Sequence, residues 1–187
     1  MTRILSFDPA SACGWSVLDN GEYTAGGTQK FTHPTKAKIK KGGKLGHRGK
    51  KWGDYGLWVR EIIAEYSPDI IVYERVRRNV STLAAHSYGY FRYMIEAEGY
   101  ITETPIYPFD VGSWKALITD DGSSNKQKVD EYISKVFPDV IFESDDHSDA
   151  LSIGYSAWLL YDKDIDLLDK LWENNTKAKK KDKAEKK

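Results

Sequence analysis

The sequence predicts an α/β protein whose mixed five-stranded sheet has three antiparallel strands followed by parallel strands and is flanked by helices. Three strand-like runs come first, and Asp19-Asn20-Gly21 between two of them is a strong hairpin signal. Helical and strand patterns then alternate, which is typical of parallel strands joined by helices. The run 69–74 is continuously apolar, as expected for a strand buried on both faces. The antiparallel strands are predicted over 3–8, 13–18 and 22–31.

The other elements follow from the spacing of apolar residues and from residues that end helices. Leu57, Trp58 and Ile62 are spaced as on one helix face, which predicts a helix over 54–66 that stops before Pro68. Gly99 and Pro138 are expected to end two further helices. The remaining predicted elements are a helix over 81–98, a strand over 100–106, helices over 110–118 and 125–137, an extended segment over 139–143 and a final helix over 145–161.

Length and composition indicate one domain. The 187 residues are expected to form a domain over 1–165, with a basic inserted loop at 36–53 and a polar, Lys-rich, disordered tail at 166–187. The single cysteine, Cys13, excludes an internal disulfide framework and fits a reducing compartment. No apolar run approaches the roughly 18 residues of a membrane span, and no signal peptide is visible. These observations predict a cytoplasmic protein without membrane contact.

The formal net charge of zero hides two strongly basic segments. Residues 36–51 hold eight Lys or Arg and no acid, and residues 177–187 hold seven Lys against two acids, so the rest of the chain has 13 basic and 26 acidic residues. Basic clusters are typical of phosphate-backbone binding, although they also occur as solvated, disordered chain. We expect disorder in the tail and nucleic-acid contact in the first segment, through Lys36, Lys38, Lys40, Lys41, Lys44, Arg48, Lys50 and Lys51.

Four acidic residues stand at related positions. Asp8 and Glu74 end two predicted strands, whereas Asp146 and Asp149 lie in the first turn of the last helix, on one face of it. If the two strands are parallel neighbours, their carboxyl ends meet and Asp8 lies close to Glu74. Each acid alone is an ordinary turn or helix-terminal residue. Together they form a costly group of charges that divalent metals would neutralise, and carboxylate-bound metals suit phosphodiester hydrolysis.

The motifs around these acids resemble those of a known family. Ile4-Leu-Ser-Phe-Asp8-Pro9-Ala10-Ser11 with Gly14, then Ile71-Val-Tyr-Glu74, then Asp146-His-Ser-Asp149-Ala-Leu resemble, in this order, the acidic motifs of RuvC-type Holliday junction resolvases, of the ribonuclease H-like superfamily. Between them, Val111-Gly-Ser-Trp-Lys115 and Ser124-Asn-Lys126 resemble a stretch whose two lysines touch DNA near the active site. The resemblance extends from about residue 3 to 160 and implies a ribonuclease H-like fold.

The chain departs from the family pattern at three places. Ala10 stands where the family usually has Gly, and the basic segment 36–53 is longer than the corresponding connection in the bacterial enzymes. Arg77 and Arg78 occupy the region in which those enzymes carry an aromatic residue used at the junction. The chain therefore looks more like phage-borne relatives that cut several branched DNAs, which would act in the host cytoplasm.

The resemblance implies a metal-dependent, structure-specific DNA endonuclease that nicks four-way junctions. Two Mg²⁺ ions about 4 Å apart, for which Mn²⁺ would substitute, would be held by Asp8, Glu74, Asp146 and Asp149. The expected products carry 5′ phosphate and 3′ hydroxyl ends, and no small-molecule cofactor is expected. Lys115 and Lys126 would offset negative charge at the reacting phosphate. The further residues expected to contact branched double-stranded DNA are Arg77, Arg78, Lys115, Lys126 and Lys128.

A homodimer would match the two-fold symmetry of a four-way junction. The helix over 81–98 has apolar residues beyond one stripe, which indicates either a second contact face or a deeply buried core helix. His147, between the two helical acids, is either an exposed bystander or a group that positions water or metal. In the helix over 81–98, the apolar residues that lie beyond one stripe are drawn from Tyr88, Tyr90, Phe91, Tyr93 and Met94.

Two other functions fit the same residues. A ribonuclease H of this fold would cut RNA–DNA hybrids, and a non-catalytic module would bind branched DNA without needing the acids. An actin-like ATP-binding domain also begins with a strand and an acidic turn, but it needs two such halves, for which 187 residues are too few.

Overall fold

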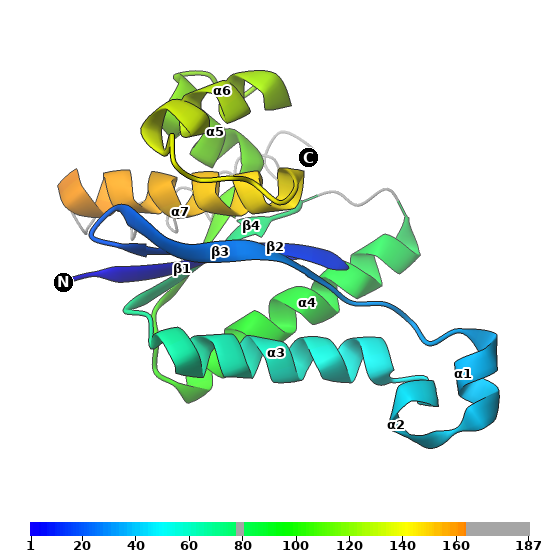
Figure 1. Ribbon diagram of the computed structural model, residues 1–187. Coiled ribbons are helices and arrows are strands. Elements are labelled where there is room, and N and C mark those ends of the chain that lie inside the picture. Colours follow the sequence, from blue (N-terminus) through cyan, green and yellow to red (C-terminus); the bar gives the residue numbers. More distant parts are fainter. Residues whose placement is uncertain (78–80, 164–187) are drawn as a thin grey trace, which may run out of the picture.

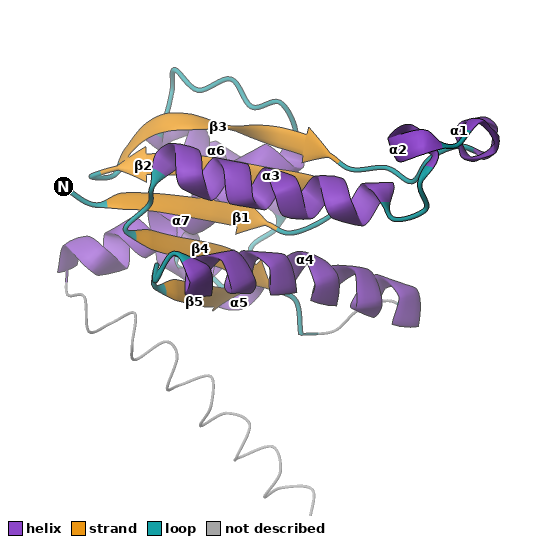
Figure 2. Ribbon diagram, turned by 90° about the horizontal axis from the view of Figure 1, so that it is seen from below, coloured by secondary structure: helices purple, strands orange, loops and turns teal. Residues whose placement is uncertain are grey.

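One mixed sheet organises the computed structural model, which describes residues 1–77 and 81–163. Strands β1 and β2, and β2 and β3, pair antiparallel, whereas β4 runs parallel to both β1 and β5. Figure 2 shows the resulting order β3-β2-β1-β4-β5. The predicted mixed five-stranded sheet is confirmed. The strands are β1 (Arg3–Asp8), β2 (Ala12–Asp19), β3 (Glu22–Lys30), β4 (Ile70–Arg75) and β5 (Ile106–Asp110).

Helices cover both faces of the sheet (Figure 1). One face carries α3 (Lys50–Tyr66) and α4 (Thr82–Ile101). The other carries α5 (Val111–Thr119), α6 (Lys126–Val136) and α7 (Asp145–Lys163). Two short helices, α1 (Lys36–Lys41) and α2 (Gly43–Gly46), stand away from the body, and we call residues 36–49 the basic arm. Within the described residues no helix has the length and apolarity needed to cross a membrane.

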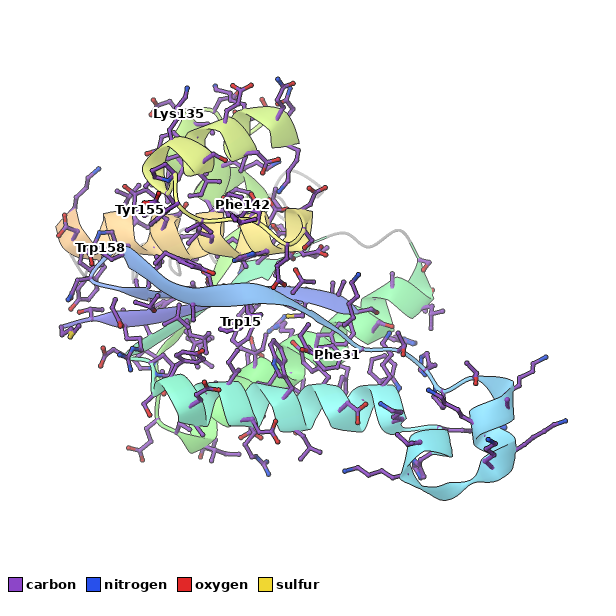
Figure 3. All side chains as sticks on the ribbon, in the orientation of Figure 1. Trp15, Phe31, Lys135, Phe142, Tyr155 and Trp158 are labelled. Atoms are coloured by element: carbon purple, nitrogen blue, oxygen red, sulfur yellow. The ribbon has the colours of Figure 1, made fainter. Side chains whose placement is uncertain are left out.

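The sheet separates two apolar cores. Along β4, Ile70 and Val72 face α5 and α7, whereas Ile71 and Tyr73 face α3 and α4. Burial on both faces explains why the run 69–74 has no polar alternation. In Figure 3, Trp15 and Phe31 lie on the α3 side of the sheet and Tyr155 and Trp158 belong to α7 on the other.

Small residues bring α7 unusually close to β1 and β2. A Cβ atom on Gly14 would overlap the backbone oxygen of Asp146, and one on Gly154 would lie 2.8 Å from the Ser6 Oγ. Between these two points the Ser6 hydroxyl donates to the backbone oxygen of Ala150 at 2.7 Å. Hydrogen bonding to α7 satisfies this buried hydroxyl, and the helix lies directly on the strand backbones.

The basic segment differs from the predicted loop over 36–53. Lys36–Lys41 and Gly43–Gly46 are helical, and α3 starts at Lys50 rather than at residue 54. Thr35 caps α1 by accepting from the backbone N–H of Lys38. The chain turns from α1 into α2 at Gly42 and Gly43, which have positive φ angles of 70° and 71°.

The predicted strand over 100–106 is also wrong, because α4 continues to Ile101 and β5 begins at Ile106. Gly99 does not end the helix. It is buried where a Cβ would overlap the side chain of Ile106, so packing rather than termination requires glycine. Pro108 lies within β5, which is tolerated because β5 is an edge strand. Residues 139–143, expected to be extended, form no strand.

Gly14→Ala tests the close contact between α7 and the sheet. Its methyl group would push the first turn of α7 away, at an expected cost of about 1–3 kcal/mol in the free energy of unfolding, measured by urea denaturation. The control is Gly53→Ala in α3, where nothing lies within 4 Å and a gain of up to about 1 kcal/mol is expected. Wild-type stability in Gly14→Ala would contradict the contact.

Candidate active site

Two carboxylates meet where the parallel strands end. We call this border the carboxyl edge: it is the edge of the sheet at which β1, β4 and β5 end, at Asp8, Arg75 and Asp110. Phe7 pairs with Tyr73 across β1 and β4, so Asp8 and Glu74 follow as the next neighbours. The predicted parallel pairing of these two strands is therefore present, and it places two acids side by side.

The first turn of α7 brings two more acids to the same edge. Asp8 pairs with Gly14 across β1 and β2, and Gly14 is the residue on which the backbone of Asp146 packs. Asp149 lies one turn further along α7, on the same face. The Ser144 hydroxyl accepts from the backbone N–H of His147 at 3.3 Å, as the N-cap residue of a helix does.

Burial raises the pKa values of all four carboxyls, and neighbouring acids raise them further. For Asp8, burial raises the pKa well above its usual value, and the charges of Glu74, Asp149 and Asp146 raise it further. Burial is also the main cause of the raised pKa values of Glu74, Asp149 and Asp146. A carboxyl whose pKa is raised by folding binds its proton more tightly when folded, so ionising it as the pH rises costs folding stability.

Positive and hydrogen-bonding groups partly offset this charge. The Lys126 ammonium lies 2.6 Å from Asp149 Oδ1 and 3.2 Å from Asp130 Oδ1. Burial lowers the pKa of Lys126, but its contacts with these carboxylates outweigh burial and the pKa is raised overall. The Trp114 indole N–H donates to Glu74 Oε2 at 3.1 Å. Lys115 is near enough to Glu74 to lower its pKa, although its ammonium donates to the backbone oxygen of Ser124.

The chemistry of these donors suits hard divalent cations. All four side chains offer carboxylate oxygens, the ligands preferred by Mg²⁺ and Mn²⁺, and burial raises the pKa of each, so an ion that compensates their charge would favour the ionised forms. In residues 1–77 and 81–163, no three His, Cys, Asp or Glu side chains are arranged as a group that could hold a metal. Glu74 and Asp149 are instead held by Trp114 and Lys126. By its chemistry the donor set fits a hard divalent cation.

His147 is neither exposed nor part of the acidic group. It is 1% exposed, and its Nδ1 accepts from the backbone N–H of Glu143 at 3.3 Å. Its Nε2 lies 3.3 Å from the Tyr23 hydroxyl, and its ring packs against Phe142. Burial lowers the pKa of His147, which favours the neutral ring. Both readings from the sequence are therefore replaced by a structural one: His147 anchors the start of α7 to β3.

The basic residues around the edge have different surroundings. On the basic arm, Lys36, Lys38, Lys40, Lys41, Lys44 and Arg48 are exposed, as a DNA-contact surface requires. Lys50 forms an ion pair with Asp54, one turn further along α3. Lys51 differs from the expected surface position, because it is 7% exposed and its ammonium donates to the Ser11 hydroxyl at 2.7 Å. Lys128 is exposed on the first turn of α6.

Arg77 shares a carboxylate with a neighbour that sequence reasoning did not single out. Asp110 accepts hydrogen bonds from both Arg75 and Arg77, and their guanidinium groups outweigh burial and lower its pKa to about 2. Arg78 lies outside the described residues, as does the tail 166–187.

Two partners of the predicted site residues were also missed. Trp114 orients Glu74, and Asp130 shares Lys126 with Asp149. The available signals were weak. Trp114 directly precedes Lys115 in the resembling motif, and Asp130 stands four residues after Lys126, a spacing at which helical side chains meet.

Comparison with known proteins finds similarity in sequence and in fold, although no family model matches. Over 159 residues the chain is 26% identical to the crossover junction endodeoxyribonuclease RuvC of Wolbachia sp. subsp. Brugia malayi (strain TRS), covering 82% of this chain and 91% of that protein. T. thermophilus RuvC in complex with a Holliday junction substrate superposes with a TM-score of 0.71 at 12% identity, covering 88% of this chain and 97% of that one.

A second solved structure has a similar fold. The yeast mitochondrial Holliday junction resolvase Ydc2 has a TM-score of 0.56 at 14% identity and covers 96% of this chain and 84% of its own. At these identities the structural likeness shows the fold, while the similarity to the Wolbachia protein extends over most of both sequences. In sequence, in fold and in the order of its acidic motifs, the chain resembles the RuvC-type Holliday junction resolvases.

Proposed function

We propose that this protein is a metal-dependent, structure-specific DNA endonuclease that nicks four-way junctions and other branched DNA. The observation that carries the proposal is the meeting of Asp8, Glu74, Asp146 and Asp149 at the carboxyl edge, from two strands and one helix. The similarity to RuvC proteins over most of the chain supports junction DNA as the substrate.

Each group at the edge has a chemical role in this proposal. Two divalent ions, Mg²⁺ or Mn²⁺, would supply an activated water and would stabilise the leaving 3′ oxygen, which yields 5′ phosphate ends. Asp8, Glu74, Asp146 and Asp149 would hold these ions through their carboxylate oxygens. Trp114 fixes the orientation of Glu74 through its indole N–H. Lys126, and Lys115 beside it, offset the charge that develops on the phosphate oxygens.

The basic arm would hold the duplex beside the acids. It lies between β3, which ends at the carboxyl edge, and α3, which begins there, so its lysines project from the edge that carries Asp8. Positive charge on the arm and on Lys128 would offset the repulsion between DNA and the acidic body. The rival functions remain separable, because a ribonuclease H would cut a plain RNA–DNA hybrid as well as a junction, and a binding module would cut neither.

Asp8→Asn should abolish cutting of a four-way junction in Mg²⁺, because it removes one metal ligand. The cutting rate is expected to fall by at least about 10³-fold. Binding should stay unchanged or become tighter, because one charge that repels phosphate is removed. The measurements are nicking of a labelled junction, with an EDTA control and an RNA–DNA hybrid in parallel, and mobility-shift binding. Exposed Asp139→Asn is the matched control. Cutting by Asp8→Asn at a near wild-type rate would refute the site.

Replacing Lys38, Lys40, Lys41 and Lys44 together by Ala should weaken junction binding and flatten its salt dependence. Each lost phosphate contact lowers the slope of log K against log salt by about 0.9, so four contacts predict a decrease of about 3 to 4. The cutting rate at saturating protein should change little. Lys135→Ala, on α6 far from the arm (Figure 3), is the control. An unchanged slope in the fourfold variant would remove the arm from the DNA-binding surface.

The protein would act as a homodimer in this proposal, through the outer face of α4. Of the apolar residues of this helix singled out from the sequence, Phe91 is buried in the core and Tyr90 and Met94 pack against it. Tyr93 is 63% exposed, and one turn before it Gly89 has open space around its Cα. An exposed glycine inside a helix lowers its stability unless another surface packs closely there.

Sedimentation equilibrium at micromolar concentration should therefore give twice the chain mass of 21.3 kDa. Tyr93→Asp should shift this mass toward the monomer, because it would bury a charge in the contact. A monomer mass for the wild type would contradict the dimer while leaving the nuclease assignment intact.

A further inference from the structure

A groove of about 480 Å³ lies directly beside Asp8. One wall is the turn from Asp8 to Ser11, and the other is the first two turns of α4, with Leu83, Ala84, Ser87 and Tyr88. Its size falls within the roughly 300–1,000 Å³ of small-molecule sites. The lining is mostly apolar with hydroxyl groups interspersed, and Asp8 stands at one end. None of the roles assigned above uses this groove.

A buried cation stands behind the groove. The Lys51 ammonium donates to the Ser11 hydroxyl at 2.7 Å and lies 5.3 Å from the centre of the Phe91 ring, and both Ser11 and Phe91 line the groove. Among the described residues Lys51 has no carboxylate partner, and burial lowers its pKa. It is also the second residue of α3, where the helix dipole disfavours positive charge. An anion in the groove would relieve both costs.

Ser11 can pass this positive charge on to a ligand. Because its Oγ accepts from Lys51, the hydroxyl proton is left to donate elsewhere, and within the described part of the chain no acceptor for it occurs. A polarised hydroxyl next to an ammonium is suited to a phosphate oxygen. At the groove mouth Leu83 is 74% exposed, an apolar side chain that water does not favour and that a flat ring could cover.

We propose that this groove holds one unstacked nucleotide of the strand being cut, with its base between Leu83, Ala84 and the Asp8–Ser11 turn and its phosphate on the Ser11 hydroxyl backed by Lys51. The inference rests on the proposed nuclease function and adds to it a contact with a base. A nucleotide matches the combination of an apolar wall with one anion site. Branched DNA supplies it at low cost, because bases at a branch point are already partly unstacked.

The test uses 2-aminopurine, whose fluorescence rises when it leaves the base stack, in a four-way junction. The probe is placed in turn on either side of the bond that the wild-type protein cuts in Mg²⁺. Asp8→Asn protein keeps the DNA intact, and it is combined with Ala84→Leu, which fills the groove, with Leu83→Ser, which removes its apolar wall, or with Ile101→Ser. Ile101 is the matched control, because it is exposed and lies 18 residues, or five turns, from Leu83 on the same helix face.

At saturating protein, Asp8→Asn alone and the double variant Asp8→Asn/Ile101→Ser should raise the fluorescence at one probe position by at least twofold. Ala84→Leu should abolish the rise and Leu83→Ser should at least halve it, with circular dichroism confirming that both variants are folded. No rise at either position, or an undiminished rise in Ala84→Leu, would overturn the groove assignment. Failure of the wild-type protein to cut the junction in Mg²⁺ would instead overturn the proposed function, so the two failures are distinguishable.

Discussion

At Gly14 the backbone of α7 lies where a side chain would otherwise stand, and the acidic group depends on this contact. Asp8 and Glu74 come together through strand pairing alone, whereas Asp146 and Asp149 belong to a helix that could have packed anywhere along the sheet. Gly14, the Ser6 hydroxyl and Gly154 fix its position along β1 and β2. Two of the four acids are therefore placed by residues that carry no charge.

The negative charge of the four carboxylates affects both folding and the binding of other charged molecules. Burial raises the pKa values of the carboxyls, so their ionisation opposes folding at neutral pH, and Lys126 only partly offsets this. Divalent ions would stabilise the folded chain by binding it and not the unfolded chain. The same negative charge would repel any polyanion, and the basic arm carries its positive charge apart from these acids.

Local patterns sufficed for much of the fold and for the acids. Parallel pairing of β1 and β4 followed from their apolar runs, and pairing alone brought Asp8 to Glu74. The failures were at glycines: Gly99 was taken for a helix end because its contact with Ile106 is tertiary, and Gly42 and Gly43 were taken for a loop rather than for a break between helices. Burial of Lys51 and His147 also depends on distant partners, which no spacing along the chain reveals.

The position of α7 in the chain has a consequence for biosynthesis. All five strands precede this helix, so the sheet can form on a growing polypeptide while half of the carboxylates are still missing. A partly translated or prematurely terminated product would carry the basic arm, Asp8 and Glu74 yet lack the two acids of α7. Under the proposed function, such a product would bind DNA without cutting it, simply because α7 is the last described helix to leave the ribosome.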